Sequence, residues 1–522
     1  MLVPVLFFAC GWGLNRPTLH YDFVYDDYPL VVEKPSLREG SLRDFLSTRH
    51  RGLGRHVTAL TLELDRRDPL SPYPFHRDNV LLAIASAAML YALGLCLGIR
   101  PLGAGLGALI FLLHPVHTEA IVNIAGRSEL LAALGVLSVL TMHVNGTTST
   151  GAGMVATAVI SFLALASKEN AACLPLLMVI FDFLRRRHEG RQPAARPYVA
   201  WGLGALLWLV LVYPNLASID PIEYVDNPLA ALPALERVPK AVAVLGRYLF
   251  ALLWPLNLAS DHSYAALDIG SSEAALTTLA LALSSVLLLT KPAERAIGRA
   301  NVFLLLFFPA AFVVTANVVF PIGTIMAERL VFLPSAGPCL LAGVAATTFA
   351  RGSRLRRVLA YGFCGVLLLA LALGYNARAR TWAGPEHFHR MAVVDSPRSA
   401  KAHYNLGLYL ARQGSLEEAT MSLERAVAIH PGFARATYYL ASVYRERGMA
   451  AQAIATYQRY LAGNPYDSGA LSQLVSLLLA ERRYAEALQR ARALVLSEPT
   501  NVDYRRTLVT VEDLVPTSSL NP

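Results

Sequence analysis

The chain has 522 residues, of which 55% are hydrophobic and only 16% are charged. Soluble domains carry about 25% charged residues, so this composition argues against a simple soluble enzyme. The hydrophobicity is uneven, because residues 1–376 hold nearly all the long apolar runs, whereas 398–513 have the composition of a soluble helical protein. We therefore expect two different units, with a linker at 377–397.

The net charge of +9 is concentrated in short basic clusters that directly follow apolar runs. Cytoplasmic loops of multispanning membrane proteins have this arrangement, whereas a nucleic-acid-binding protein gathers basic residues on one soluble face. We therefore expect an integral membrane protein with no nucleic-acid partner. The clusters are Arg185, Arg186, Arg187 and Arg191; Lys291, Arg295 and Arg299; and Arg351, Arg354, Arg356 and Arg357.

Twelve apolar segments are candidate membrane helices. The first is shorter than the ~20 residues that a span needs, and we expect a first transmembrane helix whose cytoplasmic end is missing. In chain order the segments are 1–15, 79–98, 101–116, 127–144, 152–167, 170–184, 197–216, 239–256, 273–290, 300–320, 330–350 and 356–376.

The positions of the basic loops predict which segments cross the membrane. Two cytoplasmic loops must be separated by an even number of crossings, yet three candidates lie between the loops at 185–196 and 291–299. The segment 239–256 is the weakest of the three, because it contains Lys240 and Arg247 and is amphipathic. We interpret it as an external surface helix, which leaves about 11 spans and puts loop 16–78 and the chain after 376 outside.

The C-terminal part is a repeat with a period of 34 residues. This period, with small residues and a closing proline at fixed positions, resembles the tetratricopeptide repeat. We expect three repeats, 398–431, 432–465 and 466–499, and a capping helix and tail at 500–522. Such a helical solenoid has a concave groove that typically binds a peptide or protein. The repeated residues are Pro397, Pro431, Pro465 and Pro499, with Ala419, Ala453 and Ala487.

Two adjacent carboxylates, Asp26 and Asp27, follow the first apolar segment. Because like charges repel, one of the pair can have a raised pKa and act as a base, or the pair can hold a divalent cation. The plainer interpretation is a solvated turn.

A second polar group follows the third apolar segment, where His114, His117 and Glu119 are succeeded by Arg127. Two histidines at i and i+3 with a nearby glutamate are a possible metal-binding pattern. Without a third ligand in place, the plainer interpretation is that the histidines cap a helix end and bond to loop backbone.

Several other ionisable residues lie at predicted membrane boundaries. Ionisable groups there are costly and are therefore functional candidates, although each taken alone is compatible with a structural role. They are Arg55, His76, Lys168, Glu169, Glu328 and Arg329. The topology puts all of these groups on the outer face. We therefore favour an active site at the membrane boundary over a transporter, whose polar groups would line a path through the midplane.

Taken in order, these motifs resemble the transmembrane and tetratricopeptide repeat-containing proteins, which are O-mannosyltransferase-like members of the GT-C glycosyltransferases. The family usually has proline after the arginine that matches Arg55, whereas this chain has His56. The matching stretches are Asp22–Asp27, Arg55 with Phe75, His76 and Asn79, His114–Glu119, Gly126–Glu129, Ser167–Glu169, Asp261–Tyr264 and Ala327–Ser335.

The resemblance implies an all-α fold, with a GT-C-like membrane bundle at 1–376 followed by the solenoid. It implies transfer of a sugar, mannose by analogy, from a polyprenyl- or dolichyl-phosphate donor to a Ser or Thr hydroxyl, with inversion. Asp26 and Asp27 match the catalytic base. Arg329, Lys168 and Arg127 are candidates for binding the donor phosphate. The supporting residues are Glu169, Arg55, His76, His114, His117, Glu119 and Glu328.

The family pattern leaves some points open. A divalent cation, Mg²⁺ or Mn²⁺, is a possible cofactor, and Asp26 and Asp27 would be its ligands. We expect the repeats to hold the acceptor polypeptide. The composition favours a bacterial inner membrane with the repeats in the periplasm, and the alternative is the endoplasmic reticulum membrane with the repeats in the lumen. The competing function is a non-catalytic, membrane-anchored scaffold.

Overall fold

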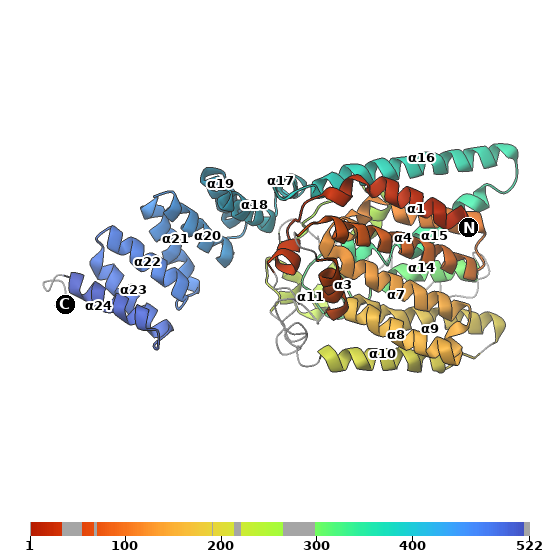
Figure 1. The fold of residues 1–522 in the computed structure, drawn as a ribbon, viewed down its shortest axis with the longest axis horizontal. Helices are drawn as coiled ribbons and strands as arrows, with labels where there is room; N and C mark the ends of the chain where they lie inside the picture. The colour runs from red at the N-terminus through yellow and green to blue at the C-terminus, as the bar shows by residue number, and fades with distance from the viewer. Residues whose placement is uncertain are drawn as a thin grey trace. The chain divides into compact units, whose positions relative to one another are not determined.

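The computed structural model describes residues 2–33, 55–66, 70–190, 192–212, 221–264 and 298–515. These residues form helices and connecting turns with no strand among them, which confirms the all-α class. The chain divides into two compact units, one made of 1–262 and 267–391 and the other of 263–266 and 392–522. Figure 1 shows the helices of both units.

The first unit is a bundle of helices that follow most of the predicted apolar segments. The predicted segment 273–290, with Lys291 and Arg295, lies outside the described residues. The helices are α1 (Leu2–Asn15), α3 (His56–Asp65), α4 (Tyr73–Cys96), α5 (Pro101–Leu113), α6 (Thr118–Ile121), α7 (Arg127–Val144), α8 (Gly151–Ser167), α9 (Leu174–Glu189), α10 (Arg196–Val212), α11 (Ala234–Leu253), α14 (Arg299–Phe312), α15 (Ala336–Phe349) and α16 (Arg354–Ala379).

Within the described residues, three helices are long and apolar enough to cross a membrane. They are Tyr73–Cys96, Ile124–Val144 and Arg354–Trp382, and a fourth results if the bent pair Pro101–Leu113 and Pro115–Ile121 is one span. Several further apolar helices, α8 and α10 among them, have only 10–17 residues. The described chain therefore supports three or four spans by length and composition, fewer than the 11 that the hydropathy pattern predicted.

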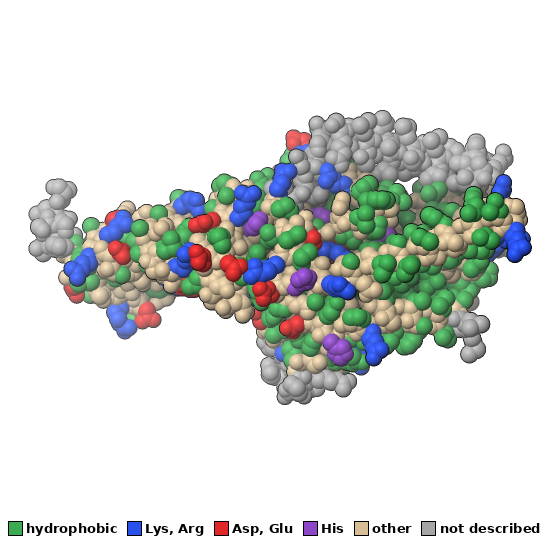
Figure 2. Space-filling model, turned by 90° about the horizontal axis from the view of Figure 1, so that it is seen from above, with side chains coloured by type: hydrophobic (Ala, Val, Ile, Leu, Met, Phe, Trp, Pro, Cys, Tyr) green, Lys and Arg blue, Asp and Glu red, His purple; other side chains and the backbone are tan. Residues whose placement is uncertain are grey.

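Figure 2 shows hydrophobic side chains spread over the flank of this unit, with few charged side chains among them. On α16, the side chains of Val358, Phe363, Val366 and Leu373 are all more than 60% exposed. Exposed apolar surface on this scale marks a membrane or protein interface. The exposed residues of α16 are therefore consistent with a lipid-facing helix.

Close helix packing in the first unit depends on glycine at the crossing of α5 and α15. A Cβ on Gly343 would overlap the carbonyl oxygen of Gly103, and a Cβ on Gly107 would lie 2.8 Å from the carbonyl oxygen of Cys339. Gly103 and Gly107 are four residues apart, so they share one face of α5. Small residues at this spacing let membrane helices approach closely without a side chain between their backbones.

Helix α11 has one buried face and one exposed face. Ala241, Val244 and Tyr248 are buried, whereas Leu235 and Leu253 are more than 80% exposed. Exposed apolar side chains beside a buried face are typical of a helix at a membrane surface.

The second unit consists of paired helices. α18 (Ala400–Arg412) and α19 (Leu416–Ile429) form the first pair, α20 (Ala434–Glu446) and α21 (Ala450–Gly463) the second, and α22 (Ser468–Ala480) and α23 (Tyr484–Ser497) the third. The last helix is α24 (Val502–Leu514). Each pair falls within one predicted 34-residue repeat. The small repeated residues Ala419, Ala453 and Ala487 are fully buried, because they lie where the helices of a pair pack together.

Candidate functional site

The first-loop carboxylates occupy different environments. Asp26 is partly buried, whereas Asp27 is fully buried. The Oδ2 atom of Asp27 accepts a hydrogen bond from the Val24 N–H at 2.9 Å, and its Oδ1 atom accepts one from the Ala125 N–H at 3.2 Å. Tyr25, in the same turn, has a positive φ of 47°. Asp27 therefore fixes the loop against the turn before α7, and Asp26 is the more accessible carboxylate of the pair.

Burial raises the pKa of Asp27 to about 8. The two backbone N–H groups lower this pKa, and the neighbouring charges of Asp26 and Asp22 raise it further. Desolvation is the largest cause, as expected for a carboxyl group without access to water.

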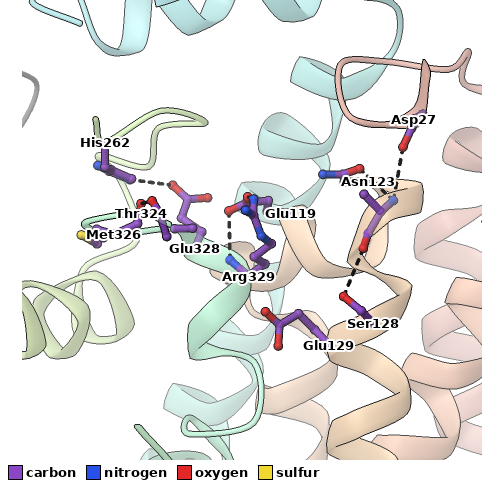
Figure 3. Close-up of polar contacts among 12 residues, drawn as sticks. Asp27, Glu119, Asn123, Ser128, Glu129, His262, Thr324, Met326, Glu328 and Arg329 are labelled. Atoms are coloured by element: carbon purple, nitrogen blue, oxygen red, sulfur yellow. Dashed lines mark hydrogen bonds and ion pairs between the residues drawn. The ribbon is translucent and has the colours of Figure 1, made fainter. Parts of the chain in front are cut away.

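Arg329 is held by Glu119 at the start of a short 3₁₀ turn, Glu328–Val331. One Glu119 oxygen is ion-paired with the Arg329 Nη1 atom, and the other accepts from the Arg329 backbone N–H at 2.9 Å. Glu119 is buried, but the Arg329 side chain is 29% exposed. Figure 3 shows Arg329 between Glu119 and Glu129. The guanidinium has five N–H donors, and Glu119 engages one of its nitrogens.

Burial lowers the pKa of Arg329, but the carboxylates of Glu119, Asp26 and Glu129 outweigh this effect and raise it above its ordinary value. Because the Asp26 carboxylate contributes to the raised pKa of Arg329, the two side chains lie within electrostatic range of each other. Arg329 is therefore a permanent cation near the more accessible carboxylate of the pair.

Lys168 is buried and paired with Glu129. Asn170 donates a hydrogen bond to the other Glu129 oxygen at 2.6 Å. Burial lowers the pKa of Lys168, and the carboxylate of Glu129 opposes this effect. Both oxygens of Glu129 are thus engaged from the turn between α8 and α9.

Arg55, the residue before α3, makes an ion pair with Glu169, which lies in the turn between α8 and α9, and two nitrogens of its guanidinium take part. The Arg55 Nη2 atom lies 2.8 Å from Glu169 Oε1, and its Nε atom lies 3.3 Å from Oε2. Burial raises the pKa of Glu169, but Arg55 and Lys168 lower it to about 2 overall. Thr58 adds a hydrogen bond to the Ser167 carbonyl at 3.0 Å, so α3 is fixed to the end of α8.

Arg127 is 1% exposed and bonded on all sides. Its Nη2 atom lies 2.6 Å from Asp65 Oδ2, and its Nε atom donates to Asn79 Oδ1 at 2.9 Å. It also donates to the carbonyls of Thr61 and Phe75, each at 2.9 Å. Arg127 therefore joins α3, α4 and α7. The preceding Gly126 permits this placement, because a Cβ there would overlap the Ala120 carbonyl.

The three histidines are buried and bond mainly to backbone. His76 Nε2 lies 3.1 Å from the Tyr21 carbonyl oxygen. His114 Nδ1 accepts from the Val116 N–H at 3.2 Å, and its Nε2 atom lies 2.9 Å from the Leu252 carbonyl oxygen of α11. His117 lies between the Phe111 carbonyl and the Ser335 hydroxyl, 2.6 and 2.9 Å away.

The Glu328 side chain is fully buried. It binds a backbone N–H and neighbouring side chains, and it does not belong to the exposed region around Arg329. One oxygen accepts from the Ala259 N–H at 2.5 Å and lies 3.8 Å from His262 Nε2. The other lies 3.3 Å from Arg378 Nη2. Figure 3 shows Glu328 directed toward His262, away from Glu119.

Helix α11 is attached to the residue just before Glu328. The Tyr248 hydroxyl donates to the Ala327 carbonyl at 3.1 Å and accepts from the Ala327 N–H at 2.8 Å. Together with the contact between His114 and Leu252, this pair of bonds fixes the C-terminal half of α11 beside the Arg329 turn.

The structure therefore separates the predicted residues into two groups. The first group forms one charged region together with Glu129, and its members are Asp26, Arg55, Glu119, Lys168, Glu169 and Arg329. The second group is buried, and its hydrogen bonds position loops and helices. Its members are Asp27, His76, His114, His117, Arg127 and Glu328. Among the residues that the structure describes, no three His, Cys, Asp or Glu side chains cluster as a metal site, so His114, His117 and Glu119 do not converge.

Some contributing residues were not expected from the sequence. Glu129 pairs with Lys168, Asp65 pairs with Arg127, and Tyr248 bonds to Ala327. Glu129 had a detectable signal, because it follows Arg127 in a motif that was already noted. Asp65 and Tyr248 had none, because each pairs with a residue more than 60 positions away.

The chain is similar to a known repeat family and to several named proteins. A tetratricopeptide repeat model matches residues 410–476. Protein O-mannosyl-transferase F38B6.6 of Caenorhabditis elegans is 26% identical over 434 residues, covering 79% of this chain and 60% of that protein. Protein O-mannosyl-transferase TMTC4 of Mus musculus is 27% identical over 460 residues, covering 76% of this chain and 62% of that protein.

A shorter match is stronger in identity. Protein O-mannosyl-transferase Tmtc2 of Drosophila melanogaster is 36% identical over 129 residues, covering 24% of this chain and 13% of that protein. Among solved structures, the Cut9–Hcn1 hetero-tetramer aligns at 14% identity over 90% of this chain and 96% of that chain, with a TM-score of only 0.24. The chain thus spans about three fifths of the length of the first two curated relatives.

Proposed function

From the resemblance to the transmembrane and tetratricopeptide repeat-containing O-mannosyltransferase-like proteins, which the named relatives confirm, we propose that this chain is a membrane glycosyltransferase. It transfers a sugar, by analogy mannose, from a polyprenyl- or dolichyl-phosphate donor to Ser or Thr hydroxyls of a polypeptide. The reaction takes place on the non-cytoplasmic side, in a GT-C-like unit of about 11 spans.

One observation carries this proposal more than any other. Arg329 is anchored by a buried glutamate yet remains 29% exposed, and it faces the region of Asp26. A lipid phosphate that leaves a sugar needs charge stabilisation, and a preorganised guanidinium provides it. Asp26, in the same region, can accept a proton from an acceptor hydroxyl.

The residues suggest the following division of roles. Asp26 takes the proton as the acceptor oxygen attacks the anomeric carbon, the bond from that carbon to the phosphate oxygen breaks, and the lipid phosphate leaves toward Arg329. Displacement from the face opposite the leaving group inverts the anomeric centre. Asp27 positions the loop that carries Asp26.

Lys168 and Arg127 differ from Arg329 as candidates for phosphate binding. Lys168 is 4% exposed and paired with Glu129, so it contributes positive charge behind Arg329 rather than a direct contact. Arg127 is bonded on every side and positions α3 and α4. Arg55 and Glu169 fix α3 at the edge of the region.

The net charge of the region around Asp26 and Arg329 bears on whether a divalent cation is a cofactor. Four carboxylates (Asp26, Glu119, Glu129 and Glu169) and three cations (Arg55, Lys168 and Arg329) give a formal charge of −1 before the donor phosphate is added. A divalent cation held at Asp26 would offset this excess, and an EDTA titration of sugar transfer with Mg²⁺ or Mn²⁺ add-back tests for it.

The relatives also guide the choice of compartment and partner. All three named relatives are animal proteins and give no support to a bacterial membrane, so we favour the endoplasmic reticulum with the repeats in the lumen. The repeat unit supplies a groove for the acceptor polypeptide. Helix α11, with its exposed Leu253 and Phe250, covers the path of the lipid donor.

The decisive experiment measures sugar transfer from dolichyl-phosphate mannose to an acceptor polypeptide by the purified chain. Asp26→Asn should lower the rate by about 10²-fold or more, because the variant lacks the base. Asp22→Asn, an exposed change in the same loop, is the matched control and should retain activity. Full activity of Asp26→Asn would overturn the assignment of the base.

A non-catalytic scaffold is the second candidate, and the helical repeats favour it. Mass spectrometry of secreted and luminal proteins from cells with and without the gene distinguishes the two. Loss of single hexoses from Ser and Thr supports the enzyme, whereas an unchanged hexose pattern together with altered protein complexes supports the scaffold.

A further inference from the structure

A cavity of about 250 Å³ lies at the other end of the first unit from the Asp26–Arg329 region. It is lined by the C-terminal ends of α4, α7 and α9 and by the N-terminal end of α14. Helix α4 begins near Phe75, which bonds to Arg127, and ends at Cys96 in the cavity wall. Because its 24 residues span about 36 Å, the cavity is remote from the proposed active site.

The lining of the cavity is mixed, with charged and polar groups next to a few apolar side chains. Leu97, Phe181 and Phe303 contribute apolar surface, whereas Arg185 and Arg299 contribute positive charge. This combination suits an amphiphilic ligand with an anionic group beside the two arginines.

The two arginines of the cavity share one carboxylate. Arg299 Nη1 lies 2.7 Å from Glu189 Oε1, and Arg185 Nε lies 3.4 Å from Glu189 Oε2. The three charges sum to +1, and two guanidinium groups offer ten N–H donors, more than one carboxylate can satisfy. Guanidinium pairs of this kind recognise phosphate.

The start of α14 adds to the positive potential. Its N-cap, Gly298, supplies no side-chain cap, and the first two residues of the helix, Arg299 and Ala300, line the cavity. The positive end of a helix dipole favours an anion there. A second cavity of about 190 Å³ shares Gly146 and Arg185 with the first, which extends the polar space beyond it.

The outer surface of α9 indicates what kind of anion this is. Leu176, Val179 and Phe183 are 38–50% exposed, and their spacing puts them on one side of α9, opposite Phe181, Arg185 and Glu189, which line the cavity. An exposed apolar side of α9 is suited to contact lipid tails, and this contact brings lipid head groups to the end of α9 that lines the cavity. Basic pockets between membrane helices on the cytoplasmic side bind phosphate head groups of anionic lipids.

We propose that this cavity binds the phosphate head group of an anionic phospholipid, with Arg185 and Arg299 as the phosphate ligands. The site is separate from the proposed active site and needs no sugar transfer. Glu189 positions the two guanidinium groups. When the phosphate binds, it replaces some of the contacts that they make with Glu189.

The test measures binding of phosphatidylglycerol to the purified full chain in detergent by native mass spectrometry, with phosphatidylcholine as the zwitterionic reference. The double variant Arg185→Gln/Arg299→Gln should weaken phosphatidylglycerol binding by at least about tenfold. Ala300→Trp, which fills the cavity but keeps every charge, should weaken it similarly. The matched control is Arg351→Gln/Arg354→Gln, which removes two exposed arginines from another loop and should leave binding unchanged.

Three outcomes would overturn the proposal. Unchanged binding by Ala300→Trp would show that lipids adsorb to the basic surface without entering the cavity. An equal loss in the control variant would show the same. Competition by glycerol 3-phosphate at concentrations equal to the lipid would show that a free phosphate ester, rather than a lipid, is the ligand. Thermal unfolding of each variant in the absence of lipid separates loss of binding from loss of folding.

Discussion

Arg127 and Arg329 are both partners of buried carboxylates in the first unit, yet their surroundings differ. Arg127 is 1% exposed and bonds to Asp65, Asn79 and two backbone carbonyls from two helices, α3 and α4. Arg329 is 29% exposed, and Glu119 holds it from one side. A guanidinium whose donors are all engaged by protein is part of the scaffold, whereas one that is anchored on one side can bind a ligand.

The difference also separates two kinds of loss on mutation. Removing Arg127 takes the buried ion-pair partner from Asp65 and a hydrogen bond from each of two carbonyls, so the cost is in folding. Removing Arg329 takes away a charge that faces the reaction region, so the cost is in catalysis.

The largest expected effect is that of Arg127→Met. We expect it to lower the free energy of unfolding of the first unit by about 3–5 kcal/mol, because Asp65 loses its buried partner. The control is Arg77→Met, since Arg77 also faces Asp65, at 3.8 Å, but its side chain is 33% exposed. That change should cost less than about 1 kcal/mol. Thermal unfolding in detergent measures both, and equal costs would contradict the distinction.

The next largest effect concerns Arg329. Arg329→Gln should lower kcat/KM for sugar transfer by about 10²-fold. Because this change strands the buried Glu119, the double variant Arg329→Gln/Glu119→Gln should regain thermal stability without regaining activity. Recovery of transfer by the double variant would show that Arg329 acts only by neutralising Glu119.

Asp27 predicts a dependence of stability on pH. Its pKa is raised from 3.8 to about 8 in the folded chain, so the folded state binds this proton more tightly than the unfolded state does. The resulting stabilisation is full below pH 3.8 and is lost as the pH rises through about 8. Melting temperatures between pH 5 and pH 9 should fall for the parent chain. In Asp27→Asn this part of the slope should vanish, and an unchanged slope would assign the effect to other groups.

The smallest expected effect is that of Thr58→Val. The change removes the 3.0 Å bond to the Ser167 carbonyl while keeping the shape of the side chain, and it should cost about 1 kcal/mol. A partial loosening of α3 should also raise the KM of the donor more than it lowers kcat. Thr61→Val on the same helix, where the hydroxyl bonds only to the local Thr58 carbonyl, is the control.

The sequence predicted the helical class, the approximate positions of most apolar helices and the tetratricopeptide repeats, because these depend on local periodicity and on prolines and alanines at fixed spacing. It also named Arg329, Glu119, Lys168 and Glu169, which form one charged region. Arg127 and Arg329 looked alike in sequence, because the spacing of residues cannot show whether a guanidinium is enclosed.

Other features depend on contacts between distant segments. Asp65 reaches Arg127 only because α3 is fixed against the turn after α8, and no local pattern reports that placement. The described residues hold fewer spanning helices than the hydropathy pattern predicted, for a related reason. The apolar run 300–320 is helical only to Phe312. It continues in turns, where Asn317 accepts a hydrogen bond from Asn227. Apolar composition alone therefore overstates the length of the helix.

The reciprocal hydrogen bonds between Tyr248 and Ala327 connect the timing of two events. Ala327 is two residues before Arg329, so α11 cannot move away from the bundle without breaking bonds at the base of the Arg329 turn. Under the proposed function, a product lipid that leaves past α11 would be released by the same movement that loosens Arg329. Exit of the lipid would then limit turnover, and Tyr248→Phe is expected to speed release of the product and to weaken binding of the donor.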